Sequence, residues 1–80
     1  MPRYFFHLVH PDRDPVRDDE GMIFEDDATA RREGIASLGE LVSDTTKTDQ
    51  TPLSVTVQIV REGVGVIDLL TAHVGQPPQL

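Results

Sequence analysis

Strict alternation of apolar and polar residues marks positions 53–59 as the clearest strand in the chain. Side chains of a strand point to opposite faces in turn, so the apolar positions share one face. These inward positions are Leu53, Val55, Val57 and Ile59. The pattern predicts a strand with one face against a core and one face directed away from it.

Residues 3–10 are aromatic and β-branched, and they are nearly apolar on both faces, which is typical of a central strand. Alternation places one set of side chains on each face of this strand. One set is Tyr4, Phe6 and Leu8, and the other is Arg3, Phe5, His7 and Val9. We assign the first set to the core because it carries no charge.

Apolar residues at spacings of three and four predict one amphipathic helix from Asp26 to about position 45. Asp26 is a suitable N-cap, and Asp27 adds negative charge at the positive end of the helix dipole. The predicted apolar stripe is Ala28, the stem of Arg31, Ile35, Leu38, Leu41 and Val42. Gly34 and Gly39 each cost about 1 kcal/mol relative to alanine. We interpret both as tolerated weak positions, and close approach to a neighbouring backbone is the alternative.

Two further strands complete the order ββαββ. Residues 11–19 contain two prolines and many charges, so they predict a connection that leads to a short edge strand ending at Phe24. This strand begins at about Val16 or Gly21. The last strand is expected over residues 64–70, with Ile67 and Leu69 under the helix.

The predicted fold is therefore α+β, with a four-stranded antiparallel sheet in the order 2-1-3-4 and one helix packed on one face. An order with one parallel pair is a second arrangement that the pattern allows. Eighty residues are enough for one sheet and one covering layer, so residues 1–72 form a single domain. The Pro-rich tail, residues 73–80, is expected to be flexible.

The net charge is −7, from 14 acidic and 7 basic residues, and the acidic residues are concentrated between positions 12 and 27. This balance argues against a nucleic-acid partner, whose phosphates attract basic surfaces. An acidic surplus commonly keeps a small protein soluble. The chain has no cysteine, no signal peptide and no long apolar run, so we expect a cytoplasmic protein that does not enter a membrane.

The opening residues 1–7, Met-Pro-Arg-Tyr-Phe-Phe-His, resemble the start of a family of short bacterial proteins of unknown function. Further matches extend the resemblance over about residues 1–70: Asp18, Gly21, Phe24, Asp26, Ala30, Arg31 and the turn at Glu62 and Gly63. This chain differs from the family in a longer loop after the first strand and in Gly34, where alanine is usual. The resemblance implies this fold and a free-standing cytosolic protein. It implies no activity, cofactor or catalytic residue.

The sequence offers little catalytic chemistry. It has no cysteine nucleophile, no activating motif around serine, threonine or lysine, and no glycine-rich phosphate loop. We therefore expect neither an enzyme nor a bound cofactor. The candidate metal ligands are His7 and His10 with Asp12, Asp14, Asp18 and Asp19. The two histidines point to opposite faces unless the strand ends by His10, so we expect no specific metal. We expect His7 to be semi-buried and bonded to a local partner.

The sheet face directed away from the helix is expected to be mostly apolar, interrupted by Arg3, Ser54, Gln58 and Asp68. Its candidate interface residues are Phe5, His7, Val9, Thr56, Val60, Val64, Val66 and Leu70. Monomers seldom leave such a patch in water, so we predict a non-enzymatic interaction module that binds a protein partner or a second copy. Simple exposure, or cover by the tail, is the alternative for this face. A small ligand or cation held in the acidic loop 12–27 is the alternative function.

Overall fold

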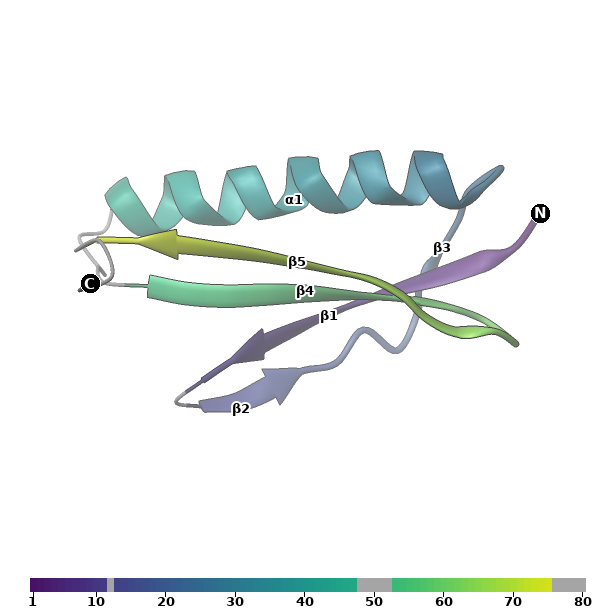
Figure 1. Cartoon of the computed structure of the whole chain (residues 1–80), viewed down its shortest axis with the longest axis horizontal. Coiled ribbons are helices and arrows are strands. Elements are labelled where there is room, and N and C mark those ends of the chain that lie inside the picture. The colour runs from purple at the N-terminus through teal and green to yellow at the C-terminus, as the bar shows by residue number, and fades with distance from the viewer. Residues whose placement is uncertain (12, 48–52, 76–80) are drawn as a thin grey trace.

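The computed structural model describes residues 1–11, 13–47 and 53–75. The elements are β1 (Arg3–His10), β2 (Arg13–Val16), β3 (Met22–Ile23), α1 (Asp27–Lys47), β4 (Leu53–Arg61) and β5 (Gly65–Val74). The strands form one antiparallel sheet in the order β2-β1-β4-β5, and α1 lies along one face of it (Figure 1). The α+β class and the predicted strand order are confirmed.

The edge of the sheet beside β1 is built differently from the prediction. Two short strands replace one: Leu8 of β1 lies opposite Val16 of β2, and Tyr4 lies opposite Met22 of β3. β2 lies inside the stretch that the sequence predicts to be a connection. Pro15, which has no amide hydrogen, fits there because an edge strand needs only half of its backbone groups for pairing.

The inward faces of β1 and β4 are confirmed. Tyr4, Val57 and Ile59 are fully buried, and Phe6 and Leu8 pack against them. Phe6 lies opposite Ile59, and Leu8 lies opposite Val57. Since residues directly opposite in an antiparallel pair share a face, the two central strands present one continuous apolar surface to the helix.

A β-bulge reverses the predicted faces of β5. Ile59 and Val60 of β4 pair with Asp68 and Val66, so Ile67 is the extra residue. Ile67 packs against the core as predicted. Beyond the bulge, however, Leu70 and Asp68 lie on the helix side, whereas Leu69 is 58% exposed on the opposite face. The placement of Leu69 under the helix and of Leu70 and Asp68 on the far face was wrong.

β5 is also longer than predicted, because it continues to Val74. It therefore includes the first two residues of the predicted tail. Residues 76–80 of that tail lie outside the described residues.

The helix begins as predicted but is rotated about its axis. The Oδ1 atom of Asp26 accepts a hydrogen bond of 2.8 Å from the backbone N–H of Thr29, which is N-cap geometry. The buried positions are Ala30 and Gly34, followed by the half-buried Leu38. Ile35, by contrast, is 58% exposed, so its predicted place in the apolar stripe was wrong. Ala28 and Arg31 of the predicted stripe are exposed as well.

Close packing explains this rotation. A Cβ atom added to Gly34 would lie 2.9 Å from Cδ1 of Ile59 and 3.1 Å from Cδ1 of Leu70. Both distances are shorter than ordinary van der Waals contacts, so a glycine here lets the helix approach the sheet closely. The interpretation of Gly34 as merely tolerated was wrong. It still holds for Gly39, whose added Cβ would meet nothing within 4 Å.

Polar contacts fix the ends of this packing. The hydroxyl of Tyr4 donates a 2.6 Å hydrogen bond to Oδ1 of Asp27, and Nη1 of Arg61 donates to the same oxygen at 3.1 Å. Burial of the Tyr4 hydroxyl, followed by its bond to Asp27, raises the pKa of Tyr4. One turn further along α1, Nε of Arg31 lies 3.0 Å from Oδ2 of Asp68. The first turns of α1 are thus attached to three strands.

The two helix glycines make a matched pair of test positions. Gly39→Ala should raise the free energy of unfolding by about 0.5–1 kcal/mol through helix propensity alone. Gly34→Ala should be less stable than Gly39→Ala by about 1 kcal/mol or more, because the new methyl group displaces Ile59 and Leu70. Urea denaturation followed by circular dichroism measures both. Equal stabilisation by the two substitutions would contradict the close approach at Gly34.

Candidate functional site

The side of the sheet opposite α1 is called the outer face below. Its strand residues are Arg3, Phe5, His7, Val9, Ser54, Thr56, Gln58, Val60, Val66, Leu69, Thr71 and His73. Six of the eight predicted interface residues belong to it. Leu70 does not, because the bulge turns it toward the helix, and Val64 lies exposed in the turn between β4 and β5.

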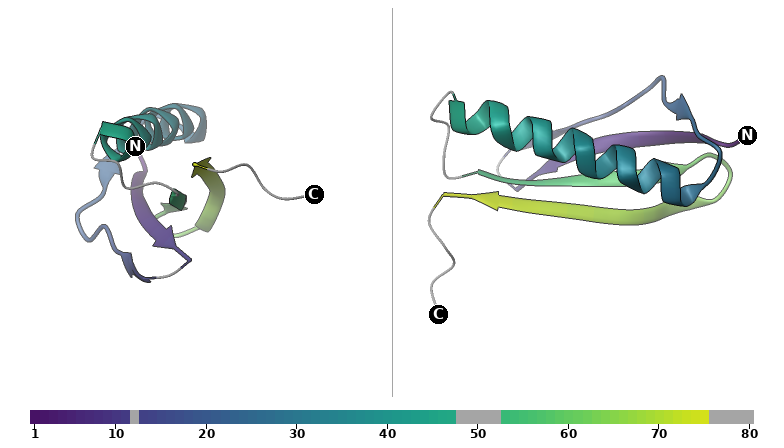
Figure 2. Two further views of the ribbon diagram at one scale, coloured as in Figure 1. Left: turned by 90° about the vertical axis from the view of Figure 1, so that its left-hand side faces the viewer. Right: turned by 90° about the horizontal axis from the view of Figure 1, so that it is seen from above.

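β2 and the segment after it curl beneath the sheet on the side opposite α1 (Figure 2). Residues of this segment form one wall of a groove on the outer face. The groove has a volume of about 310 Å³. Its lining residues are His7, Val9, Pro15, Arg17, Gln58 and Val60. Strands β1 and β4 thus supply the floor, and Pro15 and Arg17 supply the wall.

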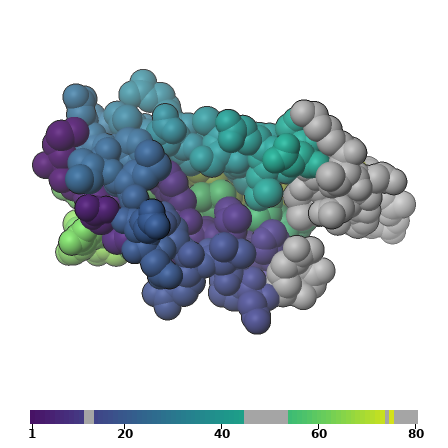
Figure 3. Space-filling model, turned by 180° about the vertical axis from the view of Figure 1, so that it is seen from behind, coloured from purple at the N-terminus to yellow at the C-terminus, as the bar shows by residue number. Residues whose placement is uncertain are grey.

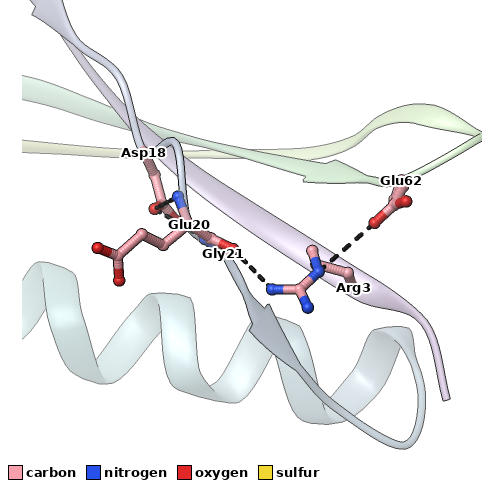
Figure 4. Close-up of polar contacts among 5 residues, drawn as sticks. All are labelled: Arg3, Asp18, Glu20, Gly21 and Glu62. Carbon is pink, nitrogen blue, oxygen red and sulfur yellow. Dashed lines mark hydrogen bonds and ion pairs between the residues drawn. The ribbon is translucent and has the colours of Figure 1, made fainter.

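The carboxylate of Asp18 holds this wall in place. Its Oδ2 atom accepts a 3.1 Å hydrogen bond from the backbone N–H of Phe6. Its Oδ1 atom accepts bonds from the N–H groups of Glu20 at 3.1 Å and Gly21 at 3.0 Å. Figure 4 shows this turn beside Arg3, whose Nη1 donates to the carbonyl of Glu20 at 2.7 Å. One carboxylate therefore joins the loop to the middle of β1.

The environment of Asp18 changes its ionisation. Partial burial opposes the charged form, but the N–H donors of Gly21, Phe6 and Glu20 together outweigh burial and lower the pKa of this carboxyl group. The lowered pKa means that the fold stabilises the ionised form of the Asp18 side chain relative to its neutral form.

His7 is fixed from the same loop. Its Nδ1 atom accepts a 3.0 Å hydrogen bond from the backbone N–H of Asp18, so the ring proton is on Nε2. The ring of Phe5 stacks beside it, with centroids 6.4 Å apart and planes at 9°. The prediction of a half-buried histidine with a local partner is confirmed. Because His7 lines the groove, Nε2–H is the donor that it offers there.

Gly21 closes the loop against β1. It has a positive φ of 72°, and an added Cβ would lie 2.7 Å from the carbonyl oxygen of Tyr4 and 2.9 Å from the ring of Phe5. A side chain would therefore be strained here both by the backbone conformation and by contact. Gly21 lets the chain return along β1 as β3.

Several carboxylates of the acidic loop 12–27 have structural roles. Asp18 holds the loop, Asp26 caps the helix, and Asp27 binds Tyr4 and Arg61. The Thr29 backbone N–H, followed by its side-chain hydroxyl, lowers the pKa of Asp26. Within residues 1–11, 13–47 and 53–75, no group of three histidine or acidic side chains is placed to hold a metal ion.

Sequence reasoning missed two residues of the groove wall and one residue of the outer face. Pro15 and Arg17 were placed in a connection, and Leu69 was placed under the helix. The only sequence signal for the wall was Val16, the apolar residue that pairs with Leu8.

No helix in the described part of the chain is both long enough and apolar enough to cross a membrane.

Comparison with known proteins identifies a family. A family model described as a domain of unknown function, DUF6894, matches residues 3–71, and the chain therefore belongs to this family. No curated protein and no solved structure matches the chain. The resemblance to an uncharacterised family is confirmed.

The role of Asp18 can be tested by Asp18→Asn. The amide nitrogen of asparagine cannot accept a hydrogen bond, so one side of the bridge between Phe6 and Gly21 is lost. We expect the free energy of unfolding at pH 7 to fall by about 1–3 kcal/mol. Asp19→Asn, at the exposed neighbouring position, is the control and should change little.

The same variant has a defined pH dependence. A carboxyl group with a lowered pKa in the folded state stabilises the fold above its unfolded pKa of about 3.9, and this contribution is lost as the pH falls through the lower, folded value. The difference between the original protein and Asp18→Asn should therefore shrink in urea titrations below about pH 4. A difference that is the same at pH 7 and in acid would contradict this role.

Proposed function

We propose that this chain, as a member of the DUF6894 family, is a non-enzymatic interaction module of the cytoplasm that binds a protein partner through the outer face of its sheet. The observation that carries the proposal is the groove and the exposed apolar side chains around it. Val9 is 38% exposed, Val66 53% and Leu69 58%, although all three lie on regular strands. Exposed apolar side chains grouped around a concave site favour a binding surface.

The polar groups of the groove support a protein partner. Arg17 has no ion-pair partner among the described residues, His7 offers Nε2–H, and Gln58 offers a side-chain amide. Arginine and a few hydrogen-bond donors around an apolar centre are typical of protein interfaces. The groove therefore suits a partner segment that places an apolar side chain next to a carboxylate or a carbonyl group.

The non-enzymatic part of the proposal is supported by the sequence. The chain has no cysteine, and the carboxylate of Asp18, which holds the groove wall, is engaged with backbone N–H groups. A general base needs a free acceptor within reach of a substrate. His7 does not provide one at Nδ1, because that atom accepts the N–H of Asp18.

Site-specific photo-crosslinking in the producing cells tests the proposal. A photoreactive residue at Val9, which lines the groove, should give a discrete adduct larger than the 8.9 kDa chain. The same residue at Glu33, exposed on α1, is the matched control and should give none. Arg17→Glu should remove the adduct at position 9. Identical adducts at both positions, or none at Val9, would contradict binding through the outer face.

A further inference from the structure

The two edges of the sheet differ in how far they are covered against pairing with another strand. Along the outside of β1, the chain places β2, β3 and, between them, the Asp18 carboxylate on the N–H of Phe6. Figure 3 views the molecule from this side and shows the segment from β2 to β3 lying against the sheet below α1. Pro15 and the charged residues of β2 are devices that discourage pairing with another chain. This edge is protected.

The edge formed by β5 carries one comparable bond, from the N–H of Leu69 to Oδ1 of Asp68, but it lacks a covering strand in the described ranges. β5 has ten residues and ends the strand order, and nothing in the described ranges pairs with its outer side (Figure 2). It contains neither proline nor lysine, and its acidic residue, Asp68, is held by Arg31. A long, nearly uncharged edge strand is a template for pairing with another strand.

Hydrogen-bond alternation identifies the groups that this edge presents. Glu62 N–H donates to the carbonyl of Arg3, whereas Phe6 N–H points to the opposite edge of β1. Neighbouring residues of an antiparallel strand bond to opposite sides, so Val57 faces β5 and its partner Leu70 faces β4. The backbone groups of Leu69, Thr71 and His73 must then face outward. The N–H of Leu69 agrees, because it donates to Asp68 Oδ1 at 2.9 Å rather than to a strand.

Exposed apolar side chains flank the edge on both sides. Leu69 and Val66 lie on the outer face of β5. Ile35 lies one helical turn after Arg31, which reaches Asp68 of β5, so Ile35 is on the flank of α1 above the same edge. The edge therefore runs between two apolar margins.

We propose that a second copy of this chain pairs its β5 antiparallel with this edge, so that one sheet continues across a two-fold dimer. An edge strand is complementary to its own copy, because outward N–H groups meet outward carbonyls. In this dimer the N–H of Leu69 exchanges its bond to Asp68 Oδ1 for one to the second copy. With Leu70 on the two-fold axis, Leu69 pairs with the partner's Thr71, and nearly all of β5 overlaps. The two helices then lie side by side, with Ile35 directed toward the other copy.

The size and charge of the contact fit a second copy. Ten strand residues give an edge about 33 Å long. The side of the molecule along this edge, which comprises β5 and the flank of α1, is about 20 Å high, so each copy offers a contact area of about 650 Å². Stable interfaces bury about 800 Å² on each partner.

In this register the two Asp68 carboxylates lie about 13 Å apart, beyond a Debye length of about 8 Å at physiological salt. The edge shares Val66 and Leu69 with the outer face, but its pairing uses none of the residues that line the groove, so the dimer does not depend on partner binding in the groove.

Sedimentation velocity of the full chain over about 10 µM to 1 mM tests the dimer. The original protein should reach twice the chain mass of 8.9 kDa. Thr71→Pro removes one outward N–H and should raise the dissociation constant at least about tenfold, while the circular dichroism spectrum is kept. Thr71→Val, which loses the 2.8 Å hydroxyl bond to Thr56 but keeps the N–H, is the matched control and should remain dimeric.

A second pair of variants decides the question if Thr71→Pro fails to fold. Ile35→Glu/Leu69→Glu adds charge at both margins and should give monomers. Val16→Glu/Ile23→Glu adds the same charge at similarly exposed positions on the protected edge and should leave the dimer intact. The inference is overturned by a monomeric original protein, or by a dimer that survives the Ile35 and Leu69 changes. A dimer that instead dissociates with Val9→Asp would assign self-association to the outer face.

Discussion

The carboxylate of Asp18 binds the middle of the outer edge of β1, between the residues that pair with β2 and those that pair with β3. The chain returning along β1 pairs with Leu8 and His10 through β2 and with Arg3 and Tyr4 through β3, so it leaves the middle of β1 open. Asp18 fills this gap by accepting the N–H of Phe6, and it also holds the turn that leads to Gly21. Charge-assisted bonds of this kind are stronger than neutral ones, and they fix direction as well as distance.

Three features of the molecule depend on that bridge. The loop position creates the wall of the groove, the backbone of Asp18 selects the tautomer of His7, and the edge of β1 is closed to other strands. The acidic composition of residues 12–27 is therefore partly structural. Net charge alone suggests a solvated acidic loop, whereas the geometry gives Asp18, Asp26 and Asp27 separate and specific partners.

The features predicted from sequence are those set by local periodicity. The alternation around Val57 fixed the face of β4, and the absence of charge on Tyr4 and Phe6 selected the face of β1. The bulge at Ile67 carries no glycine or proline signal, so the reversal of Leu69 and Leu70 was not predictable from alternation. The double pairing of β1 and the bridge by Asp18 depend on contacts between distant residues, which the pattern alone does not contain.

The two errors in side-chain orientation have a common physical origin. Hydrophobicity favours burying Ile35 and Leu69, but the fold buries Gly34 and Leu70. At Gly34, the missing side chain lets Ile59 and Leu70 pack directly against the helix, and these contacts take the place of a buried isoleucine side chain. In β5, the bulge turns Asp68 toward the helix, where it binds Arg31. Both choices leave an apolar side chain at the same margin of the sheet, next to the edge of β5, so the monomer gains internal packing and leaves its remaining apolar surface where another strand can cover it.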